Sequence, residues 1–230
     1  MPENMNAKSF SIPPLFKKKK CSVPTALGWV LLLTPGLAVV CFLFLTIHPF
    51  LAVNRPLGSG ALIIEGWVPD YCFDSAAVLL KNGTYQKAFI TGGPLETGSY
   101  LIAYNTYAEL GARTLSRSST IPDSLIIPVP APHSRVDRTW GSACAFRDWL
   151  DSTGSPIVTF DLLSQSTHTR RSRLFFRRAL GSDCRIGSQA IADPDYNPNR
   201  WWTSSKGVRQ TIDESIAYLY ALFFITFNRQ

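Results

Sequence analysis

The sequence predicts an α/β fold. In it, a Rossmann-like, doubly wound, mostly parallel five-stranded sheet has helices on both faces and follows one transmembrane helix. Two observations predict the sheet. Short apolar runs alternate with helix-like stretches about five times over residues 61–230, which is the order of repeated strand–helix units. The runs are apolar at successive residues, as in strands covered on both faces. A third observation, a long uncharged segment near the N-terminus, predicts the transmembrane helix.

The uncharged segment begins directly after four lysines. Lys17 to Lys20 precede a stretch, from Cys21 to Asn54, that contains no Asp, Glu, Lys or Arg. Its most apolar part, from about residue 23 to 47, is longer than the roughly 20 residues that a helix needs to cross the hydrocarbon layer. The hydrophobic region of a cleaved signal peptide has roughly 7–15 residues, so we expect an uncleaved anchor.

The charges that flank the predicted span set its expected orientation. Lysines precede the span and only Arg55 follows it closely, which favours a cytoplasmic N-terminus and a domain outside the cytoplasm. The predicted layout is a basic cytoplasmic tail over 1–22, a transmembrane helix over 23–47, a linker over 48–60 and an α/β domain over 61–230.

Composition argues against two classes of function. The 230 residues carry a net charge of +7, but the first 54 residues hold five lysines and one glutamate, so the remaining chain is only mildly basic. We therefore expect no nucleic-acid partner. The domain's cysteines, Cys72, Cys144 and Cys184, form no CxxC pair, so we expect no metal site. Whether any two of them form a disulfide stays open.

The first half of the domain is predicted to contain three strands and two helices. The apolar runs that predict strands cover 61–66, 87–93 and 124–130. The first helix is expected to begin at Asp70, a favourable N-cap residue, and to end at Gly83, a favourable C-cap residue. A second helix is expected from Ser99 to Gly111 by the same start and stop signals.

The second half continues the alternation of helices and strands. Helices are predicted from about Asp137 to Gly154 and over 167–181, and strands over 156–163 and 184–191. A last helix is predicted over 204–228. Its apolar run, Ile216 to Phe227, has twelve residues, which is too short to cross a membrane, so we expect this helix to face the core.

Polar residues and glycines gather where the predicted strands end. Ligands bind beyond the carboxyl ends of the strands in open parallel sheets, so these ends form the expected site. The four strand ends contribute Glu65 with Gly66, Thr91 with Gly92 and Gly93, Arg135 to Thr139, and His168 with Arg171. A turn or a helix cap also explains any one of these sets. Four sets at one edge of the sheet favour a binding crevice.

Each of these residue types has a chemical use in such a crevice. Glu65 and His168 are the candidate catalytic residues, because a buried carboxylate is costly unless paired or functional and a histidine titrates near neutral pH. Glycines let backbone N–H groups approach an anion, and arginines bind phosphate or carboxylate groups. The candidate ligand- or anion-binding residues are Gly66, Thr91, Gly92, Gly93, Arg138, Thr139 and Arg171. Asp70 and Asp137 are interpreted as helix caps.

The helix predicted over 167–181 carries five arginines with different expected roles. At 100° per residue, one set lies opposite the apolar face and is expected to be solvated. This set is Arg170, Arg173 and Arg177. Arg171 borders the crevice. The roles of Arg178, and of His133 in a proline-rich loop, stay open.

Three stretches of the domain resemble a known family over about residues 61–222. They are "ALIIEGWVPDYCFDSAAVLLKNGTYQKAFITGG", "DRTWGSACAFRDWL" and "STHTRRSRLFFRRALG", and they resemble the SanA/ElyC/YdcF family. The positions that match its motifs are Gly92 and Gly93, Thr139, His168 and Arg171. The "EGW" after the first strand departs from the glycine-rich strand end of many members.

The resemblance implies a single-pass protein of the bacterial inner (plasma) membrane whose domain lies in the periplasm. It also implies a link to the envelope permeability barrier and to peptidoglycan or lipid-carrier metabolism. Some family members have been proposed to bind a nucleotide-like cofactor such as S-adenosylmethionine. The family has no securely established reaction, so the resemblance supplies neither a substrate nor a cofactor.

Three functions fit these observations, and whether the domain is catalytic stays open. The first is an envelope enzyme that binds or processes an anionic, phosphate-bearing ligand, such as a lipid-linked precursor. The second is a non-catalytic module that senses a ligand or acts as a scaffold. The third and weakest is a nucleotide- or S-adenosylmethionine-binding transferase.

Overall fold

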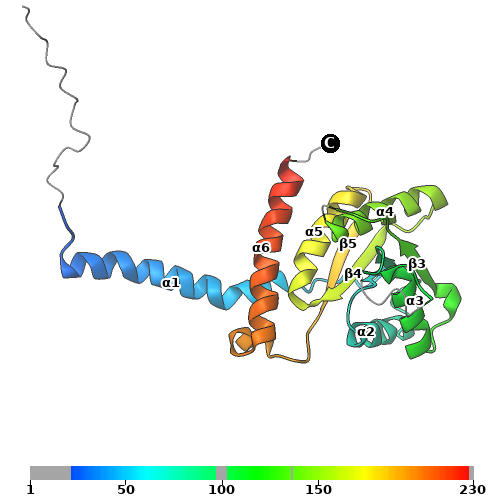
Figure 1. Ribbon diagram of the computed structural model, residues 1–230, viewed down its shortest axis with the longest axis horizontal. Helices are drawn as coiled ribbons and strands as arrows, with labels where there is room; N and C mark the ends of the chain where they lie inside the picture. Colours follow the sequence, from blue (N-terminus) through cyan, green and yellow to red (C-terminus); the bar gives the residue numbers. More distant parts are fainter. Residues whose placement is uncertain (1–21, 97–102, 136, 228–230) are drawn as a thin grey trace, which may run out of the picture. The chain divides into compact units, whose positions relative to one another are not determined.

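The structure is a computed structural model that describes residues 22–96, 103–135 and 137–227 (Figure 1). The chain divides into two compact units, Met1–Phe42 and Leu43–Gln230. The first unit contains the greater part of helix α1 (Ala26–Leu51), and the second contains the end of that helix and the whole α/β domain.

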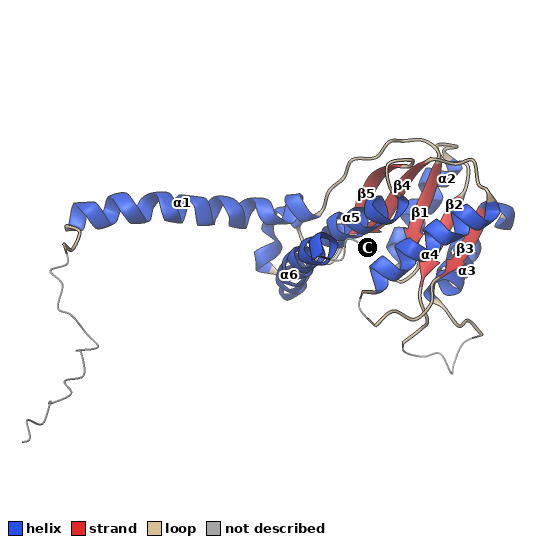
Figure 2. Cartoon of the chain, turned by 90° about the horizontal axis from the view of Figure 1, so that it is seen from above, coloured by secondary structure: helices blue, strands red, loops and turns tan. Residues whose placement is uncertain are grey.

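Five parallel strands form one sheet in the order β3–β2–β1–β4–β5 (Figure 2). The strands are β1 (Ala61–Glu65), β2 (Ala88–Gly92), β3 (Ile126–Pro130), β4 (Thr159–Gln165) and β5 (Arg185–Ile191). β1 lies in the centre and pairs with β2 on one side and with β4 on the other. The strand order reverses there, so the carboxyl end of β1 lies at the point where open α/β sheets bind ligands. The predicted fold class is confirmed.

Helices cover both faces of the sheet, and each face has its own apolar core (Figure 1). One face is covered by α2 (Asp70–Lys81) and α3 (Tyr107–Ser118), and the other by α4 (Arg138–Thr153), α5 (Thr169–Leu180) and α6 (Ser205–Phe227). Successive side chains of β1 serve the two cores in turn: Leu62 and Ile64 belong to the first, Ile63 to the second. Burial of each such side chain contributes roughly 1.5–3 kcal/mol, which explains the continuous apolar runs.

Helix α3 differs from its prediction. It begins at Tyr107, after the N-cap residue Thr106, whose hydroxyl accepts a hydrogen bond from the backbone of Glu109. The predicted start at Ser99 lies outside the described residues, and 103–106 are not helical. Gly111, expected to end the helix, lies inside it. A Cβ there would lie 2.9 Å from the Cα of Gly66, so this glycine serves close packing and not termination.

The two aspartates interpreted as helix caps have different positions. Asp137 is the N-cap of α4, because its Oδ1 accepts a hydrogen bond of 3.0 Å from the backbone N–H of Trp140. Asp70 is the first residue of α2, and Pro69 precedes it as the N-cap. Its interpretation as a cap was therefore wrong, although a carboxylate in the first turn still interacts favourably with the helix dipole.

Helix α1 has the length and composition of a membrane span. Its most apolar 18-residue window has a mean hydropathy of 2.6, and a signal sequence near an N-terminus shares these features. The helix runs from Ala26 to Leu51, past the predicted end at residue 47. The segment predicted as a linker, 48–60, packs onto the domain: Leu51 and Val53 are buried, and Arg55 forms a β-bridge with Ser188.

Helix α6 lies beside α5 (Figure 1), and only one of its sides faces the core. Ala221 is fully buried there, and Phe224 packs against Phe175. Apolar side chains on the opposite side, including Ile216 and Leu219, are exposed. The prediction of a core-facing helix was therefore correct for one side only, because the apolar residues extend around more of the helix than the domain covers.

The four described cysteines, Cys41, Cys72, Cys144 and Cys184, are free thiols. Cys72 is fully buried, and burial, with smaller contributions from Asp193 and Glu65, raises its pKa to about 12. A thiol with such a pKa stays protonated and unreactive at neutral pH.

Candidate functional site

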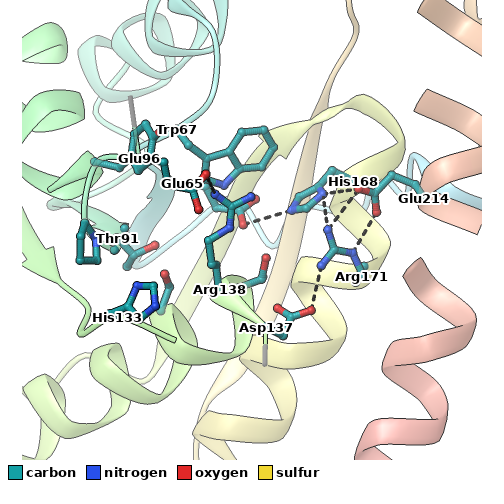
Figure 3. Close-up of a pocket in the computed structure, with 16 residues that line it drawn as sticks. Glu65, Trp67, Thr91, Glu96, His133, Asp137, Arg138, His168, Arg171 and Glu214 are labelled. Atoms are coloured by element: carbon teal, nitrogen blue, oxygen red, sulfur yellow. Dashed lines mark hydrogen bonds and ion pairs between the residues drawn. The ribbon is translucent and has the colours of Figure 1, made fainter. Parts of the chain in front are cut away.

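A cavity of about 400 Å³ opens at the carboxyl ends of the strands (Figure 3). The predicted site residues that line it are Glu65, Thr91, Gly92, Gly93, Arg138, Thr139, His168 and Arg171. His133, whose role the sequence left open, also lines it. Gly66, predicted to bind a ligand, does not. The other lining residues are Trp67, Pro94, Glu96, Tyr107, Asp137, Ser142 and Glu214.

Two of the predicted glycines are explained by the packing of α3. A Cβ on Gly66 would collide with the backbone carbonyl of Tyr107, and a Cβ on Gly92 would lie 2.7 Å from the Cβ of Tyr107. Both glycines therefore allow the first turn of α3 to approach the ends of β1 and β2. Gly93 differs, because the nearest atom to a Cβ there is 3.8 Å away. Packing therefore requires a glycine at positions 66 and 92, whereas position 93 has room for a side chain.

Glu65 is a buried carboxylate at the end of β1, and donors of the protein stabilise its charge. It accepts hydrogen bonds from the hydroxyl groups of Ser164 and Ser172, the second at 3.0 Å. Burial raises the pKa of Glu65, but the charge of His168 and these hydrogen bonds outweigh it, and the net pKa lies below the usual value. Glu65 is thus ionised at neutral pH and is unsuited to act there as an acid.

His168 lies between two carboxylates (Figure 3). Its Nδ1 is 2.7 Å from Oε1 of Glu214, and its Nε2 is 3.5 Å from Oε1 of Glu65, which is an ion-pair distance and not a hydrogen bond. The edge of the ring packs against Trp67 with centroids 4.6 Å apart. Burial disfavours the charged ring, yet the charges of Glu65 and Glu214 raise the pKa of His168 to about 9. The imidazolium is therefore the neutral-pH form.

The protonation of His168 leaves one N–H group of this cavity-lining residue without a hydrogen-bond partner among the described residues. In the imidazolium both ring nitrogens carry a proton, and Nδ1–H donates to Oε1 of Glu214. The second proton of the imidazolium then lies on Nε2, which has no hydrogen-bond partner among the described residues. An imidazolium N–H in this position can donate a strong hydrogen bond to a ligand oxygen, or release its proton as a general acid.

Arg171 holds Glu214 in place. Its Nε donates to Oε2 of Glu214 at 2.9 Å, its Nη2 donates to Oε1 at 3.1 Å, and its Nη1 donates to Oδ2 of Asp137 at 3.2 Å. Burial raises the pKa of Glu214, but His168 and Arg171 outweigh it and lower the pKa to about 2. Arg171, predicted to bind a ligand anion, thus directs its N–H groups largely at two carboxylates of the protein.

Arg138 is the more available of the two predicted arginines. It forms a 2.6 Å ion pair with Glu96 at the cavity mouth, and the two side chains are 64% and 57% exposed. Exposed pairs of this kind contribute about 0–1 kcal/mol, so a ligand anion can displace Glu96 at little cost.

Thr91 supplies a second buried polar atom without a partner. Its Oγ1 is buried at the end of β2, lines the cavity and has no hydrogen-bond partner among the described residues, as is the case for Nε2 of His168. A buried polar group without a partner costs about 1–3 kcal/mol. Two such atoms in one cavity therefore point to a bound ligand or water as the missing partner.

Glu214 is the important site residue that the sequence did not indicate. It lies 46 residues after His168, in a helix expected to face the core, and only the packing of α6 against α5 brings the two together. Its one sequence signal is the acidic pair Asp213–Glu214, one residue before the apolar run. Asp137 was indicated as a cap and also binds Arg171, since its two carboxylate oxygens have different partners.

No protein-family model matches this sequence, and no match was found among curated proteins.

Proposed function

We propose that this chain is a membrane-anchored envelope protein whose cavity binds an anionic, phosphate-bearing ligand, and that His168 protonates the ligand in a reaction. One observation carries the proposal: His168 lines the cavity with Nε2 of its charged ring 3.5 Å from Oε1 of Glu65, and this nitrogen has no hydrogen-bond partner among the described residues. Glu65 and Glu214 keep the ring protonated at neutral pH, as a general acid requires before it acts.

The donors available to a ligand favour an anionic oxygen. His168 and Arg138 are cationic, and Arg138 has an exchangeable partner. Thr91 adds a hydroxyl group, and Gly93 leaves room for close approach to the backbone. The carboxylates of Glu65 and Glu214 are occupied by protein donors, which limits their repulsion of a ligand anion.

The envelope part of the proposal rests on α1 and on the resemblance to the SanA/ElyC/YdcF family. A helix of the length and hydropathy of α1 suits a single membrane span. Lysines before the span favour a cytoplasmic N-terminus and a domain outside the cytoplasm. The resemblance adds the bacterial inner membrane and cell-wall or barrier metabolism as the setting.

A second function, ligand binding without turnover, is favoured by the state of the carboxylates. The pKa values of Glu65 and Glu214 are both lowered, so neither carboxylate is a strong base at neutral pH, and both retain the proton on His168. An acid whose proton is held this firmly also suits a module that senses an anion. The experiment below separates the two functions by looking for a product.

The test uses the full chain in lipid nanodiscs, with inorganic phosphate and undecaprenyl phosphate as probes. We expect a probe to raise the unfolding temperature, and saturation at a hundredfold excess over Kd corresponds to about 2.7 kcal/mol. Arg138→Gln should weaken this shift. The matched control is Arg178→Gln, which removes the same charge from a residue that does not line this cavity.

The outcomes separate the candidate functions. Ligand binding together with phosphate release from a phosphate ester, lost in His168→Gln, supports an enzyme. Ligand binding with no product supports the sensor. No shift with either probe, or an equal loss in Arg138→Gln and Arg178→Gln, would remove the basis for an anion site in this cavity.

A further inference from the structure

One side of α6 presents apolar side chains to the outside of the domain. Ile212, Ile216, Leu219 and Tyr220 follow the i, i+4, i+7, i+8 spacing of a single helix face, and each is exposed, Ile216 by 64%. We refer to these four residues as the outer face of α6. A contiguous patch of exposed apolar side chains marks a protein or membrane interaction site, whereas single exposed apolar residues are ordinary.

The opposite side of α6 is fixed to the domain. Thr211 and Ala221 are buried, and Glu214 binds His168 and Arg171. Phe224 packs against Phe175 of α5. These contacts determine which side of α6 is turned outward. The fold therefore holds the outer face in its exposed position.

The outer face belongs to a helix that contacts the end of the candidate membrane span. The last residues of α1, Leu43–Leu51, belong to the same compact unit as α6. Within that unit the ring of Phe50 lies 5.6 Å from the ring of Tyr218, on α6. The ring of Phe44 lies 4.7 Å from that of Trp201 in the 3₁₀ helix (Pro198–Thr203) that precedes α6. Where the span leaves a bilayer, α6 is therefore close by.

Aromatic and basic residues accompany this junction. Trp202 is exposed, as is Tyr220 on the outer face, and Trp and Tyr side chains concentrate at the boundary between lipid and water. The guanidinium of Arg170 lies 3.9 Å from the ring centre of Phe50. Arg209 is exposed one turn before Ile212. Cations beside an apolar helix face suit the headgroups of anionic lipids.

We propose that the outer face of α6 lies in the boundary between lipid headgroups and acyl chains, so that α6 is an interfacial helix beside the membrane span. The inference rests on α1 being inserted in a bilayer, as proposed above, and does not depend on the ligand of the cavity. A bilayer is preferred to a second copy of the chain because the helix contacts the end of the span and has aromatic and basic neighbours.

The proposal links the membrane surface to the cavity. Ile216 and Glu214 lie within one turn of α6, the first on its outer face and the second in contact with His168. A bilayer that holds the outer face therefore also holds the helix that positions Glu214.

The test places a nitroxide label on the full chain in vesicles of phosphatidylcholine and phosphatidylglycerol. Ile216→Cys reports on the outer face, and Leu219→Cys is a second position in case the first variant fails to fold. Val78→Cys is the matched control, an exposed apolar residue on α2, which covers the other face of the sheet. Leu37→Cys, on α1, reports on the span. The background replaces every native cysteine except the buried Cys72.

The readout is the ratio of collisions with oxygen, which enters lipid, to collisions with a water-soluble nickel chelate. We expect this ratio to be severalfold higher at Ile216, Leu219 and Leu37 than at Val78. A high ratio at Leu37 with ratios at Ile216 and Leu219 equal to that at Val78 overturns the interfacial helix and leaves the anchor intact. A low ratio at Leu37 overturns the anchor and the interfacial helix together.

Association with a second copy has a different signature. It would bring two labels at Ile216 close together and broaden the spectrum by spin–spin coupling, in proportion to the amount of labelled chain. Such broadening, removed when unlabelled chain is added in excess, would also overturn the proposal. We expect a spectrum that does not change on this dilution.

Discussion

His168 and Glu214 lie 46 residues apart in the sequence, yet Nδ1 of His168 is 2.7 Å from Oε1 of Glu214 in the structure. The contact joins the helical turn after β4 to the last helix, so it forms only when α6 packs on α5. Arg171 donates to both oxygens of the same carboxylate, and these two hydrogen bonds fix the orientation of the Glu214 carboxylate toward the imidazole. Together with Glu65, this arrangement keeps His168 charged, and it leaves Nε2 as the ring nitrogen without a hydrogen-bond partner among the described residues.

The first prediction concerns the charge of His168 in Glu214→Gln. Removing one of the two carboxylates that stabilise the imidazolium should lower the pKa of His168 from about 9 toward its ordinary value of 6.5. NMR titration of the imidazole signals measures this change directly. Asp213→Asn, which removes a neighbouring exposed charge from the same helix, is the control. An unchanged His168 titration in Glu214→Gln would contradict the proposed origin of its charge.

The second prediction is a pH window of maximum stability. The folded pKa of His168, about 9, is above its unfolded value of 6.5, so its contribution is fully present below pH 6.5 and is lost as the pH rises through about 9. The folded pKa of Glu214, about 2, is below its unfolded value of 4.5, so its contribution is present above pH 4.5 and is lost as the pH falls through about 2.

Together these two groups should give their greatest stabilisation between about pH 4.5 and 6.5. Denaturant unfolding of the full chain over a series of pH values measures it. In His168→Gln, the fall in stability between about pH 6.5 and 9 should be smaller than in the wild type. An equal fall in both proteins would show that other groups cause it.

The third prediction compares two adjacent glycines. Gly92→Ala should destabilise the domain by about 1–3 kcal/mol, because the added Cβ would lie 2.7 Å from the Cβ of Tyr107 and 2.9 Å from the backbone N of Ala108. Gly93→Ala is the matched control, with its nearest contact at 3.8 Å, and should be close to neutral in stability. Denaturant midpoints compare the two. Equal effects would contradict the close approach of α3 to β2.

The fourth prediction concerns thiol reactivity. Cys72 is fully buried with a pKa raised to about 12, so it should resist alkylation by iodoacetamide in the folded chain and react after denaturation. Cys184, which is half-buried and lies outside α1, should react without denaturation. Mass spectrometry of the alkylated peptides measures both sites. Modification of Cys72 at the rate of Cys184 would contradict its burial.

Much of the fold follows from local patterns. Continuous apolar runs around Ile63, Phe89 and Leu162 predicted strands that are buried on both faces, and the structure confirms this burial. Such a run can be recognised without knowing which strands pair with one another. Strand ends then indicated the edge at which Glu65, Thr91 and His168 line one cavity, because parallel strands bring their carboxyl ends to the same side.

Other features were not predictable from local sequence. Gly111 resembles a helix stop, but its missing side chain serves contact with Gly66 in another element. Arg171 resembles a ligand-binding cation, yet Glu214 and Asp137 occupy its donors. Each case depends on a neighbour that is distant in the chain, so the same residue type is compatible with two roles until the neighbour is known.

By itself, the sequence determined the order of strands and helices, the candidate membrane span and the sheet edge that carries the cavity. These depend on hydrophobic periodicity and on the rule that parallel strands end on one side, and both act within short stretches of chain. Only the tertiary structure decided that Glu214 binds His168 and that Ile216 faces outward. Both depend on the side of α6 that packs against α5, and the nearly continuous apolar run of α6 does not specify that side.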